Sequence, residues 1–282
     1  MANLLSLKRR IRAAGNVSKT TRAMQMIAVS KLKRAQDAAL AGRPYVEKLS
    51  SITQDVLARL DKNHQHAYMK KGTGKTLVIV MSPDKGLCGG LITNLIRETI
   101  NLDLNNKDNI YITIGKRIES TAVKLQKEIV ASFKFGTTLP TFDSVMPIVK
   151  IVDEYFLGEK VESVKILSTN FLSIFSQKPK LDCILPIERL YPKESAFSLF
   201  EPSPEKQLPI LLRHLLEMTI YQRFLESYAS EQGARMVAMQ NATDNALEIA
   251  QSLMLEYNKG RQEKITNEIL DIGGSAFTFA YE

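Results

Sequence analysis

The sequence predicts an α/β protein in which long helices at the two chain ends pair as an antiparallel coiled coil and carry a central Rossmann-like α/β domain. Two observations support this fold. The ten prolines all lie within residues 44–209, so a helix can run through each end of the chain. Between the ends, runs of β-branched residues alternate with helical stretches, the order typical of a mostly parallel sheet.

The N-terminal helix is expected over residues 4–60. Good helix formers predominate there, and apolar or small residues recur at helical spacing, beginning with Leu4, Leu7, Ile11 and Ala14. The first proline lies in the stretch 42–44, directly after a glycine and an arginine. Because proline removes a helix hydrogen bond and clashes with the preceding turn, we expect a kink there.

A second long helix is expected from Leu208 to about Ile272, with Pro209 at its start, where a helix tolerates proline. At 1.5 Å per residue it would span ~95 Å, more than a compact domain can cover. Antiparallel pairing with the N-terminal helix is the simplest way to bury both apolar stripes. The seam mixes leucine with small and polar residues such as Gly15, so we expect a rod whose surface also faces something other than its partner helix. An ordinary helical bundle is the alternative.

The central region follows a different rhythm. Strands are expected at residues 77–81, 110–114 and 164–168, with helices near 89–104, 116–127 and 144–157. The connectors 61–76 and 190–207 are rich in Lys, Gly, Pro, Ser and Glu, which is typical of domain boundaries. The predicted organisation is therefore an N-terminal shaft helix at 1–60, an α/β domain with its connectors at 61–207, and a C-terminal shaft helix at 208–282.

The positive charge is concentrated at the N-terminus. The chain has 38 basic and 30 acidic residues, a net charge of +8, yet residues 1–36 hold nine basic side chains and no acidic one. The remainder is nearly neutral, with 29 basic against 30 acidic residues. Such a basic helix fits a nucleic acid, a solvated face or an acidic protein surface, and charge alone does not choose among them.

The composition argues against a membrane-spanning protein, a disulfide-bonded protein and a metal-binding protein. No apolar run approaches the ~20 residues of a membrane-spanning helix, so the chain itself is not expected to cross a bilayer. The only cysteines, Cys88 and Cys183, stand far apart, which favours a reducing compartment without a disulfide framework. His64 and His66 lie in a polar stretch that we interpret as a surface loop, so no metal site is expected.

Two glycine-rich segments resemble phosphate-binding loops. The segment 72–76 ends in Gly-Lys-Thr, but it precedes a predicted strand and lacks the first glycine of the motif, so we reject a P-loop. Gly86, Gly89 and Gly90 do lie between a strand and a helix, yet their spacing is not that of a dinucleotide site. We interpret them as a tight structural turn. No nucleophile, acid–base pair or cofactor site is visible, so no enzyme chemistry and no cofactor are expected.

Three segments resemble one known family. Leu7–Lys31 closely resembles the start of the gamma subunit of the F-type rotary ATP synthase, and Asp84–Gly90 matches that family's central motif. Ser230–Ala246, continuing through Tyr257–Ile269, looks like its C-terminal signature. Three matches in the same order, spread over nearly the whole chain, make the resemblance specific.

The resemblance implies a non-catalytic rotor subunit. A family member stands as an axle inside a hexamer of alternating alpha and beta subunits, with its base on the membrane c-subunit ring and the epsilon subunit. Ion flow turns ring and axle, and the axle drives the beta subunits through their nucleotide-binding states. The resemblance thus implies a peripheral membrane location, on the cytoplasmic face of a bacterial plasma membrane or the matrix side of a mitochondrial inner membrane, and no nucleic-acid partner.

The resemblance also implies site residues. Family contacts with the beta subunit map to Met24 in the N-terminal helix and to Arg261 and Gln262 in the C-terminal helix. An arginine there forms forked, charge-assisted bonds with carboxylates. Read without the family, the same three residues would be a solvated helix face.

The chain departs from the family pattern in three places. Pro83 and Ile92 flank the glycine turn where a small residue and an asparagine are usual, and the tail 273–282 is unusually aromatic. A basic coiled-coil protein that binds nucleic acid or serves as a scaffold is the alternative function. Aromatic side chains that stack on bases would favour it, but residues 1–36 contain none.

Overall fold

The computed structural model describes residues 4–60, 66–105, 108–189 and 201–279, and side chains in the last helix as far as residue 270. The chain forms two compact units. One contains residues 1–27 and 238–282, and the other contains residues 28–237. We call them the shaft unit and the sheet unit. The predicted boundaries near residues 60 and 207 follow the ends of the long helices, whereas these units follow the packing in space.

The two long terminal helices are present. Helix α1 runs from Leu4 to Arg59 and helix α5 from Pro204 to Phe279. Helix α1 continues through Pro44, where a kink was predicted. Helix α5 begins four residues before the predicted start, because proline is well suited to the first helical position, and the carbonyl of Ser203 accepts from the amide of Gln207 at 3.2 Å.

Five strands form the sheet, in the order β3-β2-β1-β4-β5. Strands β1 (Lys75–Met81), β2 (Asn109–Ile114) and β4 (Val161–Phe171) include the three predicted strands, and each is longer than predicted. Strand β1 pairs in parallel with both β2 and β4. The prediction of a mostly parallel sheet is therefore confirmed.

Two strands were not predicted. Strand β3 (Ile129–Phe133) extends the parallel sheet beside β2, and β5 (Gln177–Leu185) pairs antiparallel with β4 at the opposite edge. Strand β5 carries Pro179 and several charged residues, a composition that an edge strand tolerates and a central strand does not. Its sequence therefore gave no strand signal.

Helices α2 (Leu91–Asn105), α3 (Lys116–Lys124) and α4 (Met146–Leu157) agree with the predicted helices to within a few residues at each end. Two short 3-10 turns, η1 (Ala67–Met69) and η2 (Phe142–Ser144), precede β1 and α4. The connector residues 61–65, with His64, and 190–200 lie outside the described residues, as do the side chains of the aromatic tail beyond residue 270.

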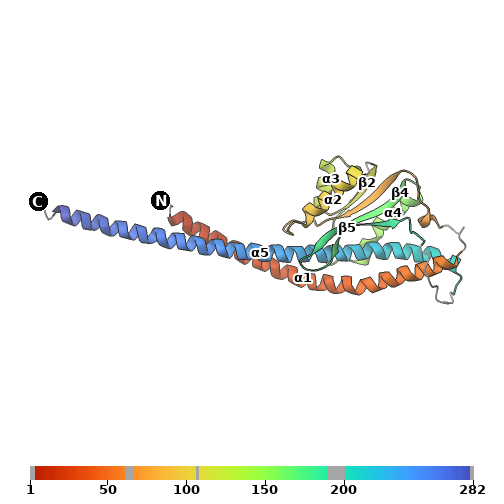
Figure 1. Cartoon of the computed structure of the whole chain (residues 1–282), viewed down its shortest axis with the longest axis horizontal. Coiled ribbons are helices and arrows are strands. Elements are labelled where there is room, and N and C mark those ends of the chain that lie inside the picture. The colour runs from red at the N-terminus through yellow and green to blue at the C-terminus, as the bar shows by residue number, and fades with distance from the viewer. Residues whose placement is uncertain (1–3, 61–65, 106–107, 190–200, 280–282) are drawn as a thin grey trace. The chain divides into compact units, whose positions relative to one another are not determined.

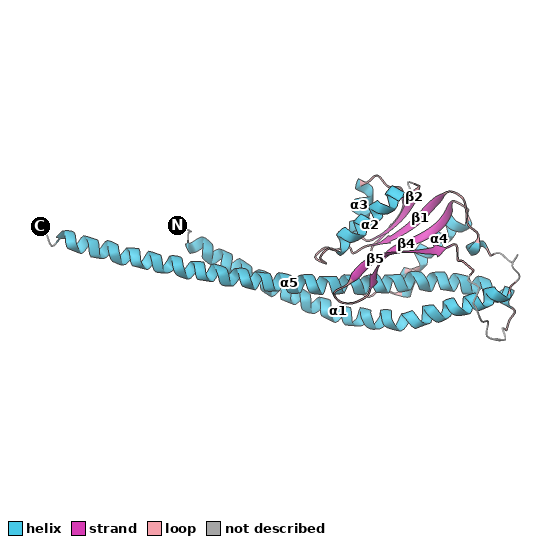
Figure 2. Ribbon diagram, in the orientation of Figure 1, coloured by secondary structure: helices cyan, strands magenta, loops and turns pink. Residues whose placement is uncertain are grey.

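Side chains of successive strand residues point to opposite faces of the sheet, so one strand supplies two cores. Leu77, Ile79 and Met81 of β1 pack with α4 and with buried residues of α1 and α5. Val78 and Val80 pack with α2 and α3 on the other face. Figure 1 and Figure 2 show α2 and α3 on one side of the sheet and the two long helices on the other. The sheet unit is thus a three-layer α/β domain that includes the inner parts of both terminal helices.

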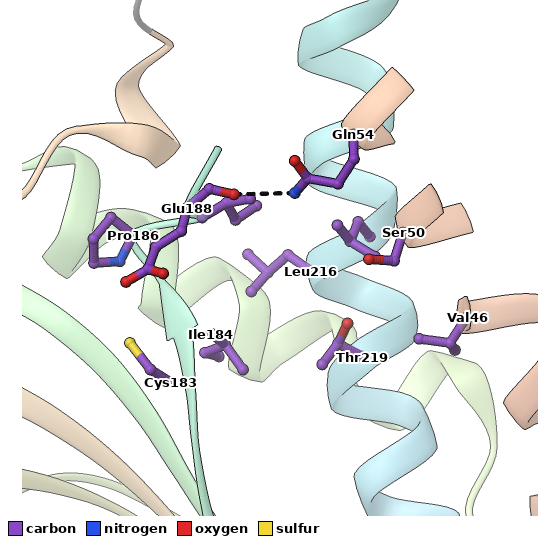
Figure 3. A pocket seen from close by; sticks show the side chains of 11 residues that line it. Val46, Ser50, Gln54, Cys183, Ile184, Pro186, Glu188, Leu216 and Thr219 are labelled. Carbon is purple, nitrogen blue, oxygen red and sulfur yellow. Dashed lines mark hydrogen bonds between the residues drawn. The ribbon is translucent and has the colours of Figure 1, made fainter. Parts of the chain in front are cut away.

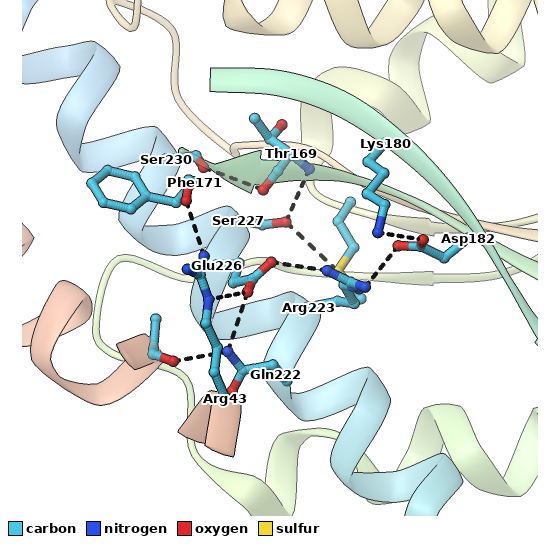
Figure 4. Close-up of polar contacts among 12 residues, drawn as sticks. Arg43, Thr169, Phe171, Lys180, Asp182, Gln222, Arg223, Glu226, Ser227 and Ser230 are labelled. Carbon is cyan, nitrogen blue, oxygen red and sulfur yellow. Dashed lines mark hydrogen bonds and ion pairs between the residues drawn. The ribbon is translucent and has the colours of Figure 1, made fainter. Parts of the chain in front are cut away.

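Within the sheet unit, α1 and α5 are joined by a buried polar network (Figure 4). The carboxylate of Glu226 is almost fully buried and accepts from Arg43 Nε and Arg223 NH1, each at 2.9 Å. Arg43 also donates to the carbonyl oxygen of Phe171 at the end of β4, at 3.0 Å. Because each oxygen of the Glu226 carboxylate accepts from a guanidinium group, the cost of burying its negative charge is compensated.

Candidate interaction surfaces

The shaft unit pairs the two chain ends directly. The hydroxyl oxygens of Thr21 and Thr243 lie 2.7 Å apart, and a Cβ on Gly260 would lie 3.4 Å from Leu4. Residues of α1 near its start therefore meet residues of α5 near its end, which makes the pair antiparallel, as predicted.

The seam between these helices mixes small and polar side chains with large apolar ones. Its buried members are Leu7, Ser18, Met239, Thr243, Ala246 and Leu253. Few large side chains interlock across it, whereas a leucine zipper places one at every a and d position. The seam therefore buries only part of the apolar surface that the helices carry.

Much of that apolar surface is exposed. Large apolar side chains in the shaft unit with at least about two-fifths of their surface exposed are Leu5, Val17, Met24, Met26, Ile27, Leu247, Ile249, Met254, Leu255, Ile265, Ile269 and Leu270. Exposed apolar residues in this number, mixed with charge, mark a surface that other proteins contact. The basic side chains Lys8, Arg9, Arg10, Arg12, Lys19 and Arg22 are exposed on the same unit.

The three sequence-predicted contact residues all lie in the shaft unit and all point outward. Met24 is 39% exposed, and Arg261 and Gln262 are exposed on α5. The backbone carbonyl of Gln262 accepts from Thr266 within the helix at 3.0 Å. The geometry leaves these side chains accessible to a partner.

The glycine turn lies at the carboxyl end of β1. Gly89 has a positive φ of 59°, a conformation that favours glycine. Gly86 and Gly90 do not have a positive φ. Leu87 also has a positive φ, 63°, and is 64% exposed. Asp84, the residue before the turn, accepts from the backbone amides of Lys116 at 3.0 Å and of Gly136 at 2.9 Å.

The carbonyl groups of this turn are bonded by helix α5. Arg235 NH2 donates to the carbonyl oxygens of Lys85 and Gly86, each at 3.3 Å. Arg235 NH1 also pairs with Glu231 Oε1 at 2.6 Å. Burial raises the pKa of the Glu231 carboxyl above its ordinary value, while the Arg235 guanidinium opposes the rise.

Sequence reasoning assigned no role to Arg235 or Glu231. The available signal is a pair of opposite charges four residues apart in helix α5, a spacing that brings them onto one helix face. The sequence does not show that this face is buried against the turn, because the burial depends on packing between distant segments.

The rejected P-loop has the geometry of a connector. Gly72 donates its amide to the carbonyl oxygen of Glu162 at 3.3 Å, and Gly74 has a positive φ of 110°. The segment leads into β1 and opens no helix. Phosphate-binding loops place their backbone amides at a helix N-terminus. This segment does not have that arrangement, because a strand follows it and not a helix.

One cavity of the sheet unit lies between α1, β5 and α5, with a volume of about 360 Å³ (Figure 3). Its lining includes Gln54, Cys183 and Glu188, and Gln54 Nε2 donates to the backbone carbonyl of Glu188 at 3.0 Å. The rest of the lining is largely apolar, and no cluster of acid, base and nucleophile meets there.

Other kinds of site are absent from the described part of the chain. Residues 4–60, 66–105, 108–189 and 201–279 contain no group of three or more His, Cys, Asp and Glu side chains that could hold a metal ion. Within the same ranges, none of the helices has both the length and the apolarity needed to span a membrane.

Comparison with known proteins gives a consistent result. The family model described as ATP synthase matches residues 3–278. An ATP synthase gamma chain of Dehalococcoides mccartyi (strain CBDB1) is 40% identical over 99% of this chain and 100% of its own length. One of Methylacidiphilum infernorum is 36% identical over 98% of this chain and 99% of its own length.

Solved structures share the fold. A chain in the Euglena gracilis mitochondrial ATP synthase (OSCP/F1/c-ring, rotational state 3) has a TM-score of 0.71 at 16% identity, covering 98% of this chain and 94% of that one. A chain in the central stalk and c-ring of the Tetrahymena thermophila mitochondrial ATP synthase has a TM-score of 0.60 at 23% identity, covering 79% of this chain and 99% of that one. The alternative of a nucleic-acid-binding or scaffold protein finds no support among these relatives.

Proposed function

Because the chain belongs to the ATP synthase gamma-chain family, we propose that it is the central-stalk rotor subunit of an F-type ATP synthase. In this role it couples ion-driven rotation of a membrane ring to conformational cycling of the beta subunits. The observation that carries the proposal is the surface of the shaft unit, where two paired helices leave apolar and basic side chains exposed along their length.

This surface suits an axle in a hexamer. A pair of helices has no threefold symmetry, so three equivalent beta subunits around it meet three different sets of side chains. Each set stabilises a different beta-subunit conformation, and turning the axle exchanges the sets. The basic N-terminal helix adds attraction for acidic surfaces within a Debye length of ~8 Å. The chain itself supplies no catalytic group in this scheme.

The proposed partners follow from the same scheme. The shaft unit contacts the alpha and beta subunits. The base of the rotor, which is the α/β domain, contacts the epsilon subunit and the membrane c-ring. The protein is then a peripheral membrane protein, on the cytoplasmic face of a bacterial plasma membrane or the matrix side of a mitochondrial inner membrane.

Three residues are proposed to contact the beta subunit. Arg261 and Gln262 form hydrogen bonds with a loop of the beta subunit that holds no nucleotide. The Arg261 guanidinium donates two N–H groups to a carboxylate of that loop. Met24 supplies an apolar contact from α1. The outward direction and exposure of all three side chains support this role.

A reversible cross-link tests rotation. In a Cys183→Ser background, which removes the exposed native thiol, Gln262→Cys is paired with a cysteine on the facing beta-subunit loop. Oxidation is expected to stop ATP hydrolysis by the assembled complex, and reduction to restore it. The control complex lacks the beta-subunit cysteine and should keep its activity under oxidation. Full-rate hydrolysis with the link closed would show that this chain need not rotate.

A further inference from the structure

Helix α5 fills the position at which α/β folds of this kind usually bind a ligand. Ligands of such folds bind outside the carboxyl ends of the strands, at the point where the strand order reverses. The order β3-β2-β1-β4-β5 places that point between β1 and β4. In this protein, residues 227–235 of α5 bond to the ends of both strands.

The contacts with β4 come from two serines. Ser227 Oγ accepts from the backbone amide of Thr169 at 3.3 Å, and Ser230 Oγ donates to the carbonyl oxygen of the same residue at 3.2 Å. Figure 4 shows both serines pointing from α5 toward the end of the strand. These bonds hold α5 along one side of the reversal point.

The contact with the end of β1 is made by Arg235 alone among the charged residues described on α5. Its guanidinium binds the carbonyl oxygens of Lys85 and Gly86 and the carboxylate of Glu231. The side chains of Arg235 and Glu231 are only 17% and 5% exposed. Charge-assisted bonds in such a poorly hydrated place are stronger than neutral ones.

The turn that Arg235 holds is braced on its far side. Asp84 accepts from the amides of Lys116 and Gly136, which follow β2 and β3. Gly115 at the end of β2 packs so closely that an added Cβ would stand 1.8 Å from the carbonyl oxygen of Ser82. Force on the carbonyl groups of Lys85 and Gly86 therefore reaches the ends of three parallel strands.

We propose that Arg235 is a positioning residue that fixes the rotational angle of helix α5 against the five-stranded sheet. Torque applied to the sheet is then passed to the helix. The inference rests on the proposed rotor function. Helix α5 continues to Phe279, so a twist delivered at residue 235 enters a helix that also forms part of the shaft unit. Without Arg235, the helix keeps the serine bonds to β4 and the bond from Tyr228 Oη to the carbonyl oxygen of Thr137, at 3.0 Å. It loses its charge-assisted bonds to the turn after β1.

Torsional stiffness is the measurement that tests the proposal. In a Cys183→Ser background, Val123→Cys on α3, a site 62% exposed, attaches a bead to the α/β domain of the fully assembled complex. With the hexamer fixed to a surface and stalled, the spread of the bead's angle reports the stiffness between domain and shaft. Arg235→Met is expected to widen that spread. It should leave ATP hydrolysis by the unloaded complex unchanged.

A local readout accompanies it. Amide hydrogen exchange of residues 84–90 is expected to speed up about tenfold or more in Arg235→Met, as loss of a charge-assisted bond implies. Glu231→Gln keeps the carbonyl bonds of Arg235 and should widen the spread less. Arg213→Met is the matched control, because Arg213 also pairs with a glutamate four residues away on α5, at 3.1 Å, but is 59% exposed. It should leave the spread unchanged.

Two results would overturn the proposal. In the first, residues 84–90 exchange faster in Arg235→Met while the angular spread stays at the parent value. In the second, their exchange does not change at all. If Arg235→Met does not assemble, Arg235→Lys replaces it. Lysine keeps the positive charge but lacks the forked N–H donors of the guanidinium, so an angular spread between those of the parent and Arg235→Met is expected. An angular spread equal to that of the parent would contradict the proposal. A parent complex that never rotates would refute the rotor function instead.

Discussion

Gly42 of α1 faces the side chain of Gln222 of α5, and a Cβ built on Gly42 would stand 2.3 Å from Gln222 Oε1. Gln222 is buried and donates to the carbonyl oxygen of Ala39 at 2.9 Å. The absence of a side chain at position 42 therefore lets the two helices approach closely enough for this bond to form. Gly15, in the same helix, has no atom within 4 Å of its Cβ position.

Two glycine substitutions in α1 should consequently have opposite effects. Gly15→Ala should raise the free energy of unfolding by about 0.5–1 kcal/mol, because alanine favours the helix. Gly42→Ala gains the same helix propensity but displaces Gln222 from its buried bonds, at a cost of about 1–3 kcal/mol. We expect Gly42→Ala to be destabilising in denaturant unfolding of the full chain.

A double substitution isolates the cause. In a Gln222→Ala background, Gly42→Ala should no longer destabilise, since the atom it displaces is gone. Equal effects of Gly42→Ala in both backgrounds would contradict the close approach of Gly42 and Gln222.

Glu226 should be far more sensitive than exposed ion-paired residues. Glu226→Ala leaves Arg43 and Arg223 without their shared carboxylate, and we expect a loss of about 2–3 kcal/mol, less than for fully buried pairs because both arginines reach solvent. Lys33→Ala breaks an exposed pair with Asp37 and should cost less than about 0.5 kcal/mol. Urea unfolding of both variants measures the difference, and equal losses would refute the structural role of the network.

Two buried tyrosines should make the fold sensitive to alkali. Burial raises the pKa of Tyr68 and Tyr111, and bonds to Asp153 and Asp103 raise it further. Unfolded tyrosines ionise near pH ~10, so above that pH the unfolded state has released protons that the folded state retains. The contribution of these two tyrosines to the free energy of unfolding should therefore be constant below about pH 9 and fall as the pH rises past about 10.

The substitutions Tyr68→Phe and Tyr111→Phe check this assignment. Each should cost roughly 1 kcal/mol at neutral pH through its lost hydrogen bond. Together they should flatten the decline of stability above pH ~10. A decline as steep as in the parent chain would mean that other groups cause it.

The proposed beta-subunit contacts predict a loss of function without a loss of stability. Arg261→Ala with Gln262→Ala replaces two exposed side chains by the best helix former, so the melting temperature of the isolated chain should not fall. ATP hydrolysis by the assembled complex should fall, by up to about tenfold for each lost charge-assisted bond. Glu263→Ala, exposed on the next helix position, should leave the rate near that of the parent. An unchanged rate in the double variant would remove Arg261 and Gln262 from the contact surface.

The sequence by itself determined the elements whose signal is local. Helical spacing and the confinement of proline identified both terminal helices, and β-branched runs identified β1, β2 and β4 to within a few residues. These signals are strong because each element either lacks helix breakers over many residues or is buried on both faces, so its composition alone is distinctive.

Only the tertiary structure decided the rest. Strand β5 forms because β4 offers it an edge, although Pro179 and its charged neighbours resemble a loop. Arg235 acquires its bonds because residues about 150 positions away place two carbonyl groups beside it. Pairings of this kind depend on chain segments meeting in space, so no local pattern encodes them. The long helices can be predicted from the sequence alone. The way in which α5 is bonded to the sheet depends on the folded chain.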